Sequence, residues 1–239
     1  LMPSVTTSSD AGAGIGYSAF RLRGTDQSRI NVTINGVPYN DPESHIVYWV
    51  DVPDLASAAE NIQIQRGVGT STNGSSSFGG SINISTHSYK PDPFATLNFK
   101  AGSFGTFGST ALFGTGLING QWTIDGRASL LHSDGYIDRA STGLQSMQAN
   151  VAWYGEKTLI RFMLMHGKEK TYQAWDGVPK DSLETNRTYN PYFYENEIDL
   201  YTQNHFHMVM SHQFSRKWNA SATGFMITGN GYYEQFKEE

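Results

Sequence analysis

The sequence predicts a mainly β protein. We expect a small, loop-rich α+β domain, followed by about seven strands of a larger transmembrane antiparallel β-barrel. Three observations favour this fold class: apolar and polar side chains alternate with a period of two after residue 91, the segments that do so are longer than most globular strands, and short and long connections alternate between them.

The composition excludes several other classes of protein. Only 16% of the 239 residues are charged, against roughly 25% in an ordinary soluble domain. Aromatic residues make up 13% and the net charge is only −5, so the chain is not expected to be disordered. It has no cysteine for a disulfide framework and no excess of basic residues for nucleic acid. No apolar run reaches the roughly 18 residues of a membrane helix. A membrane β-barrel is still possible, because only alternate side chains of its strands need to be apolar.

Neither end of the chain resembles a natural terminus. The sequence starts at Leu1 without the charged and apolar regions of a signal peptide, and it stops in a charged run at Glu239. We therefore expect an internal piece of a longer protein.

Residues 1–90 are predicted to form the α+β domain. Residues 30–34 alternate as a half-buried strand, and Asn35-Gly36 favours a tight turn after it. Residues 54–60 are the one good helix candidate, with Asp54 as its possible N-cap. A strand at 61–66, a serine-rich loop at 71–80 and a strand at 81–86 complete the prediction.

Residues 91–239 are predicted to form the barrel strands, after a proline-rich boundary at 91–93. In the third strand, apolar Trp122, Ile124 and Leu130 oppose polar Thr123 and Arg127. The second and seventh strands are ambiguous by period. The predicted strands are 95–102, 107–117, 121–132, 145–154, 157–168, 200–214 and 218–230.

The connections between these strands indicate a membrane barrel. Alternate connections are tight turns, while residues 133–144 and 169–199 are long and polar, so one end of the sheet has turns and the other has loops. Aromatic residues gather at the turn end, as at a membrane interface. They also flank turns in soluble β-sandwiches, so a soluble β-rich binding or adhesion module is the alternative. Seven strands cannot close an even-numbered barrel, so we expect more strands in the native protein. The aromatic residues are Trp122, Trp153, Tyr154, Phe214 and Trp218.

Several strings resemble TonB-dependent outer-membrane receptors of the siderophore and vitamin type. The strings RLRG (21–24) and RINVTINGVP (29–38) are similar to the "RG…DGVP" region of the family's plug domain. The strings NIQIQRG (61–67) and GGSINIST (79–86) resemble the signature that closes the plug, although Phe78 stands where the family usually has Tyr. The string GNGYYE (229–234) resembles a barrel-strand motif of Bacteroidetes-type members.

This resemblance implies a function for the whole protein. Residues 1–90 would be the later part of a plug inside a barrel of about 22 strands in the bacterial outer membrane. Such receptors bind a scarce nutrient, such as an iron–siderophore complex or cobalamin, and import it with energy from TonB, which binds a box missing from this chain. The implied partners are TonB, a small-molecule ligand such as a metal chelate, and outer-membrane lipid. The family implies no enzyme activity and no cofactor.

The resemblance also implies candidate functional residues. Arg23 and Arg66 match two plug arginines that pair with glutamates of the barrel wall, and the alternative is a pair of surface arginines beside turns. A plug loop directed outward could contact ligand, unless it is an ordinary polar loop. The plug candidates are Asn40, Asp41, Glu43, His45, Tyr48 and Trp49. The long barrel loops add Tyr136, Arg139, Tyr172, Gln173, Trp175 and Asp176.

No catalytic or metal site is predicted. His205, His207 and His212 share one strand, but no carboxylate or cysteine completes a metal-binding set by spacing, so we expect lumen-facing polar side chains. The glycine-rich strings match no dinucleotide-binding or phosphate-binding loop. An outer-membrane hydrolase would need a nucleophile, a base and an orienting group on one strand face, and none is found.

Overall fold

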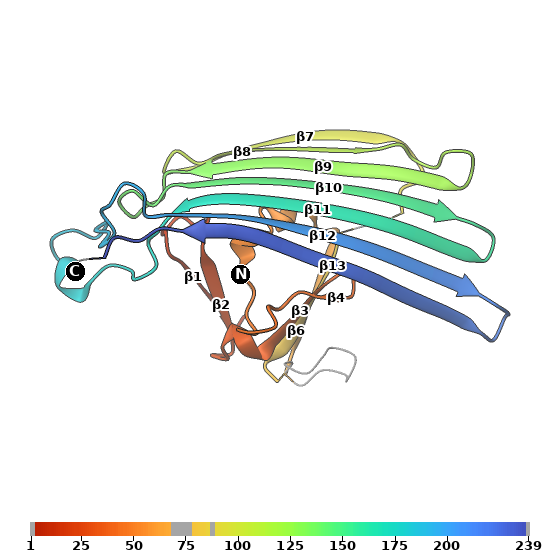
Figure 1. The fold of residues 1–239 in the computed structure, drawn as a ribbon, viewed down its shortest axis with the longest axis horizontal. Helices are drawn as coiled ribbons and strands as arrows, with labels where there is room; N and C mark the ends of the chain where they lie inside the picture. Colours follow the sequence, from red (N-terminus) through yellow and green to blue (C-terminus); the bar gives the residue numbers. More distant parts are fainter. Residues whose placement is uncertain (1–2, 68–77, 87–88, 238–239) are drawn as a thin grey trace.

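The computed structural model describes residues 3–67, 78–86 and 89–237. Within these residues the chain forms a small domain packed against one large sheet (Figure 1). The small domain, residues 3–86, holds a two-stranded sheet and a four-stranded sheet of order β4-β3-β6-β5. Its strands are β1 (Val5–Ser9), β2 (Ser18–Leu22), β3 (Ile30–Ile34), β4 (Val37–Pro38), β5 (Asn61–Arg66) and β6 (Gly80–Ser85).

The large sheet has seven antiparallel strands arranged in chain order, which confirms the predicted count. The last four strands extend two or more residues further at the loop end than predicted, because the hydrogen-bonded ladder continues there after the apolar alternation has faded; Thr142, for example, pairs with Thr171. β8 ends early, before Gly116, whose φ of 66° interrupts an extended backbone. The strands are β7 (Phe94–Ala101), β8 (Phe107–Gly114), β9 (Trp122–Ser133), β10 (Thr142–Tyr154), β11 (Thr158–Tyr172), β12 (Ile198–Gln213) and β13 (Asn219–Tyr233).

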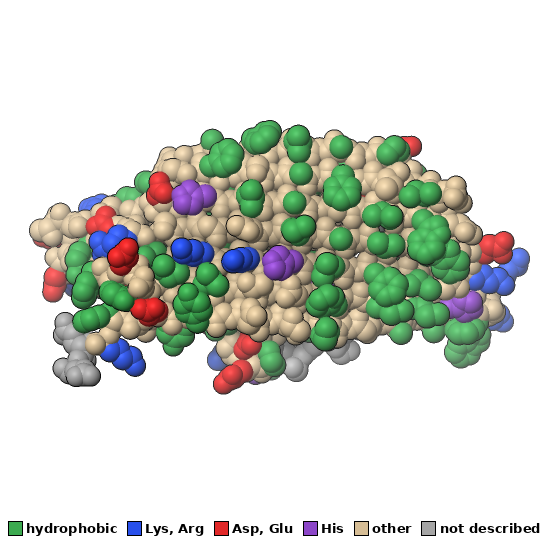
Figure 2. Space-filling view, turned by 45° about the horizontal axis from the view of Figure 1, so that its top comes forward, with side chains coloured by type: hydrophobic (Ala, Val, Ile, Leu, Met, Phe, Trp, Pro, Cys, Tyr) green, Lys and Arg blue, Asp and Glu red, His purple; other side chains and the backbone are tan. Residues whose placement is uncertain are grey.

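The two faces of this sheet have the reverse polarity of a soluble sheet. In β10, Ser146, Gln148 and Asn150 are buried against the small domain, while Met147 between them is 61% exposed. Figure 2 shows hydrophobic side chains spread over the outer face. An apolar face directed outward is expected where the surroundings are lipid. The predicted alternation is therefore confirmed.

The turn end of the sheet carries the predicted aromatic residues. Trp122 and Trp153 lie on this outer face, whereas Tyr154 shares the inward side of β10 with Asn150. Trp122 and Trp153 are in register, and their ring centroids are 6.5 Å apart. Phe214 and Trp218 are 66% and 74% exposed. The pairing register also settles the ambiguous seventh strand, because Phe225 opposite His207 must share the inward face of the sheet.

The core of the small domain extends into the large sheet. All five residues of β3 are buried, and Ile30 and Ile34 pack with Leu55 in one hydrophobic cluster. Met163 and Met165 of β11 belong to the same cluster, so the two parts share a core. β6 ends at Ser85 and β7 begins at Phe94, and the predicted domain boundary between residues 90 and 91 remains our proposal.

Two local predictions in the small domain have different outcomes. Asn35 and Gly36 both adopt positive φ, at 53° and 81°, which confirms the tight turn between β3 and β4. The predicted helix is a single turn, α1 (Leu55–Ala58), and Asp54 precedes it in a left-handed conformation without capping it. Asp54 therefore stands at the predicted N-cap position, but its side chain forms no capping hydrogen bond, because the carboxylate binds the large sheet and Ser57 Oγ.

Elsewhere in the described part of the chain, helical structure is limited to short elements. The structure has 3-10 turns at Gln27–Arg29, Trp49–Asp51 and Lys180–Ser182. No helix in the described part of the chain has the length and hydropathy needed to cross a membrane.

Candidate functional site

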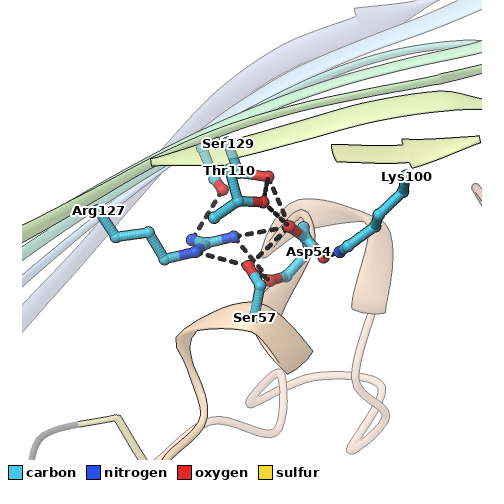
Figure 3. Close-up of polar contacts among 7 residues, drawn as sticks. Asp54, Ser57, Lys100, Thr110, Arg127 and Ser129 are labelled. Carbon is cyan, nitrogen blue, oxygen red and sulfur yellow. Dashed lines mark hydrogen bonds and ion pairs between the residues drawn. The ribbon is translucent and has the colours of Figure 1, made fainter. Parts of the chain in front are cut away.

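The first candidate site is a polar contact between the small domain and the large sheet, centred on Asp54 (Figure 3). Asp54 Oδ2 accepts hydrogen bonds from Ser129 Oγ at 2.5 Å, Ser57 Oγ at 2.6 Å and Thr110 Oγ1 at 3.1 Å. Its Oδ1 accepts a hydrogen bond from Lys100 Nζ at 2.8 Å. We call these residues, together with Arg127, the Asp54 cluster.

Arg127 of β9 is the cationic partner that the sheet buries in this cluster. Its Nη2 lies 3.2 Å from Asp54 Oδ2 and donates to the Asp54 carbonyl at 2.7 Å. Its Nε donates to Ser57 Oγ at 2.7 Å, and its Nη1 donates to Ser146 Oγ at 3.0 Å. The side chains of Arg127 and Asp54 are only 6% and 7% exposed. A buried ion pair with so many added hydrogen bonds can offset the cost of removing both charges from water.

The electrostatics of the cluster keep Asp54 ionised. Burial alone raises the pKa of the Asp54 carboxyl, but the hydrogen bonds from Lys100, Ser129 and Ser57 outweigh it and hold the pKa well below its usual range. Asp54 therefore stays negative at any physiological pH. The Asp54 cluster fixes α1 to the wall formed by β7, β8 and β9.

The second candidate site is a cleft of about 760 Å³ between the loop of residues 38–51 and strands β12 and β13. Six tyrosines and three aspartates line it, and none of its described lining residues is Lys, Arg or His. We call it the tyrosine cleft. It is an aromatic, acidic site that both the small domain and the sheet contribute to. The tyrosines are Tyr17, Tyr39, Tyr48, Tyr201, Tyr232 and Tyr233, and the aspartates are Asp41, Asp51 and Asp199.

Glycines on β13 shape this cleft. Gly229 and Gly231 face inward, opposite Gln203 and Tyr201 of β12. A Cβ on Gly231 would lie 2.4 Å from the Leu200 carbonyl and 2.6 Å from the Tyr201 ring. The Tyr201 side chain therefore lies over a stretch of β13 that carries no side chain on that face.

Among the residues that the structure describes, the carboxylates beside the cleft form no ion pair with a cationic side chain. Burial, with the negative charge of Asp199 added, raises the pKa of Asp51 to about 7. Asp199 accepts a hydrogen bond from the Tyr17 hydroxyl. Glu169 nearby is fully buried, and its Oε1 has no hydrogen-bond partner among the described residues. Beside the cleft, the interface between the small domain and the sheet therefore carries negative charge that no cationic side chain of the described residues neutralises.

Three of the six predicted plug residues line the cleft: Asn40, Asp41 and Tyr48. The Asn40 amide also holds the loop, because it donates to the Ile30 and His45 carbonyls, both at 2.9 Å. Asp41 Oδ1 accepts from the Ser44 amide at 2.7 Å and the Glu43 amide at 3.1 Å.

The other three predicted plug residues lie away from the cleft lining. Glu43 and His45 are exposed on the loop. Trp49 packs on Phe20 beside the core of the small domain, with ring centroids 5.8 Å apart.

The predicted residues of the long loops mostly bind other loop residues. Arg139 donates to the carbonyls of Asn190 at 2.9 Å and Tyr192 at 2.6 Å. Tyr172 donates to the Tyr194 carbonyl at 2.7 Å. Tyr136 packs on Phe104, Gln173 is fully buried and Asp176 is exposed.

Trp175 is a predicted loop residue that contacts the lining of the tyrosine cleft. Its ring is 5.6 Å from the rings of both Tyr17 and Tyr233, which line the cleft. It therefore stands behind two lining residues. A ligand-contacting role for any of the predicted loop or plug residues stays a prediction.

Sequence reasoning missed most of the cleft. No pattern in the neighbouring sequence marked five of its lining residues, which are Tyr17, Tyr39, Asp51, Asp199 and Tyr201. Tyr232 and Tyr233 lay in a string that was noticed only as a barrel motif. The available signal was the spacing of Gly229 and Gly231, because glycines two apart in a strand leave one face without side chains.

The two predicted arginines remain without partners in the described structure. Arg23 and Arg66 are both exposed, and neither forms an ion pair with another described residue. Their pairing with barrel glutamates stays a prediction. The ion pairs of Asp54 with Arg127 and Lys100, which join the small domain to the sheet, were not predicted.

The strand histidines follow the alternation. His205 and His207 of β12 are buried on the inward face, and His205 Nε2 lies 2.8 Å from Gln203 Oε1. His212 is at the turn end, with Nδ1 2.7 Å from Thr158 Oγ1. Among the residues that the structure describes, no three His, Cys, Asp or Glu side chains could together hold a metal ion.

Comparisons with known proteins agree with this architecture. Residues 1–81 match the family model of the TonB-dependent Receptor Plug Domain. No curated protein matches the chain in a sequence search.

Solved structures resemble the chain over most of its length. The ferric-catecholate import receptor Fiu of E. coli K12 has a TM-score of 0.73 and 17% identity, over 91% of this chain and 32% of that one. FpvA of P. aeruginosa, bound to a pyoverdine–iron complex, has a TM-score of 0.74 and 13% identity, over 92% and 30%. The alcaligin outer-membrane receptor FauA of Bordetella pertussis has a TM-score of 0.72 and 14% identity, over 98% and 36%.

The chain thus spans about a third of the length of these receptors. At identities of 13–17% the structural likeness establishes the fold alone. The family assignment rests on the match of residues 1–81 to the plug-domain model. The small domain is the plug, and the large sheet has the fold of the receptors' barrel wall. Residues 1–81 thus belong to the plug-domain family of TonB-dependent receptors, and the chain as a whole has the fold of a fragment of such an outer-membrane receptor.

Proposed function

We propose that the receptor containing this chain imports a small-molecule nutrient, such as a metal chelate, with energy supplied by TonB. TonB would bind a segment that this chain does not include. Members of this family are transporters rather than enzymes, and the proposal includes no covalent chemistry.

The observation that carries the proposal is the shared lining of the tyrosine cleft. Plug residues Asp41 and Tyr48 face barrel residues Tyr201 and Tyr233 across one space. A ligand there would contact the plug and the barrel together. Its binding energy could therefore alter how the plug is held, which a transporter that moves its plug requires.

The chemistry of the cleft favours a particular charge of ligand. Tyrosine rings and hydroxyls suit a ligand with both apolar and polar groups. Three aspartates without a lining cation favour a neutral or cationic chelate over a polyanionic one. The similar solved receptors are named for ferric catecholates, pyoverdine and alcaligin, so a siderophore is the class we propose first.

Binding and uptake by the full-length receptor test the proposal. We would titrate it with a cationic ferric trihydroxamate and with a polyanionic ferric tris-catecholate. Tyr48→Ala and Tyr233→Ala should each weaken binding by about tenfold and reduce uptake, because each removes an aromatic contact worth about 1 kcal/mol or more.

A matched control is Tyr89→Ala, because Tyr89 packs on Tyr154 at the turn end, with centroids 5.2 Å apart. It should leave binding within twofold of wild type. Equal losses in all three variants would contradict the cleft as the ligand site. Tight binding without energy-dependent uptake would contradict import and favour a binding module.

A further inference from the structure

The outer wall of the barrel carries strong charge in one place. The pairing register assigns alternate residues of each strand to the outward face, and on β11 these include His166, Lys168 and Lys170. At the other outward positions of strands β7 to β13 the register places no Asp, Glu, Lys or Arg. Figure 2 shows a short row of blue and purple side chains on this face, toward the loop end of the sheet and among hydrophobic side chains.

The two lysines lie near the upper limit of the apolar band. Lys168 is about eight residues beyond Ile160, which is about 26 Å of strand, or about 20 Å along the membrane normal for a strand tilted by about 40°. The apolar band of such barrels is about 25 Å tall. Both lysines are exposed, so their ammonium groups stand where lipid headgroups begin.

The wall is hollowed beside these lysines. A depression of about 400 Å³ is lined by apolar Phe107, Leu130 and Leu200 together with Lys168 and Lys170. Gly143 makes the hollow, because it lies between Lys170 and His132 in the register and has no side chain to fill the space. His132 is engaged with Asp134, 3.0 Å away.

We propose that this hollow binds a phosphorylated lipid of the outer leaflet. The phosphate would lie on Lys168 and Lys170, and an acyl chain would lie on Phe107, Leu130 and Leu200. Charge complementarity supports this occupant, because the two cations have no outward-facing carboxylate on the neighbouring strands. A lysine that only extends to the headgroups needs no apolar hollow beside it.

Lipid binding by the full-length receptor in detergent tests the proposal. Native mass spectrometry would titrate it with bisphosphorylated lipid A and with the same lipid after dephosphorylation. The double variant K168Q/K170Q should weaken binding of the phosphorylated lipid by about 10- to 30-fold and leave the dephosphorylated lipid unchanged, since each lysine near an anionic lipid surface contributes about a factor of five.

A second variant tests the hollow itself. Gly143→Leu should weaken both lipids by about tenfold, because its side chain would occupy the space of the acyl chain. The substitution is free of backbone strain, since a Cβ there meets only the Lys170 carbonyl oxygen, at 3.9 Å. Free inorganic phosphate should not compete with the lipid if the acyl contact is required.

Controls separate this site from general attraction. K157Q/K217Q removes the same charge from turns at the opposite end of the sheet and should stay within twofold of wild type. K168R/K170R keeps the charge and should retain binding. Heat-modifiable migration on a gel checks that each variant is folded. Wild-type affinity in K168Q/K170Q, or an equal loss in K157Q/K217Q, would overturn the proposal.

Discussion

The plug presents two aspartates to the barrel wall, and their surroundings are opposite. Asp54 meets Arg127, Lys100 and three hydroxyl groups. Asp51, three residues earlier, faces Asp199 and lies near Glu169, with no cation acting on its carboxyl. The plug is therefore attached to the wall by the ion pairs of Asp54. At Asp51 it stays packed against the wall although the nearby carboxylates repel each other. The repelling point lies beside the tyrosine cleft.

Removing the anchor should have the largest effect. Asp54→Ala leaves the Arg127 guanidinium buried without its carboxylate, which costs about 3–5 kcal/mol. We expect unfolding of the full-length receptor in urea to shift accordingly. Lys100→Gln is the matched control, since its side chain is 45% exposed and an exposed pair contributes at most about 1 kcal/mol. Equal effects of the two variants would mean that Arg127 gains nothing from Asp54.

The repelling point should make plug stability depend on pH. Burial raises the pKa of folded Asp51 to about 7, above its unfolded value of 3.8, so the folded state binds the extra proton between these values. The contribution of this proton to plug stability is complete below about pH 4 and is lost as the pH rises through about 7. Asp54 does not titrate in this range.

Asp51→Asn should reduce that dependence and stabilise the plug at pH 8 by about 1–2 kcal/mol relative to wild type. Thermal unfolding at pH 5 and pH 8 measures it. Parallel pH profiles in the variant and the wild type would contradict the assignment to Asp51.

Substitutions at glycines of β13 test how the tyrosine cleft is shaped. Gly231→Ala pushes a Cβ toward the Leu200 carbonyl and the Tyr201 ring, and should cost about 1–3 kcal/mol in stability and displace Tyr201 from the cleft. Gly224→Ala is the matched control, since nothing lies within 4 Å of its Cβ. Ligand affinity and the free energy of unfolding should both change in Gly231→Ala, and neither should change in Gly224→Ala. If Gly231→Ala changes neither quantity, the β13 backbone moves to make room for the Cβ, which would contradict the prediction.

The smallest effect is expected above the cleft, in the long loop. Arg139→Gln removes hydrogen bonds to two loop carbonyls and should cost about 0.5–1.5 kcal/mol. Faster protease cleavage within residues 173–197, with unchanged global unfolding, is the measurement. A change in global unfolding as large as that of Asp54→Ala would mean that the loop is part of the main core.

The sequence predicted what is set by neighbouring residues. The alternation in β9, β10 and β12 and the turn at Asn35-Gly36 depend on residues one or two apart. Asp54 was assigned correctly to the start of α1, but its carboxylate was misassigned because its partner Arg127 is 73 residues away. Tyr17 and Asp199 are separated by 182 residues. Contacts of that range follow from how the plug lies against the sheet, which no local pattern encodes.

The two methionines of the shared core set how stiff the plug–barrel boundary is. Met163 and Met165 project from the wall into the hydrophobic cluster of the plug, and the Met163 sulfur lies 3.0 Å from the Asn35 amide nitrogen. Branched side chains would interlock with the plug and resist sliding. Unbranched thioethers change rotamer at small cost and fill whatever space a neighbour leaves. Along β11 the contact between wall and plug can therefore adapt to small changes in the packing of either side.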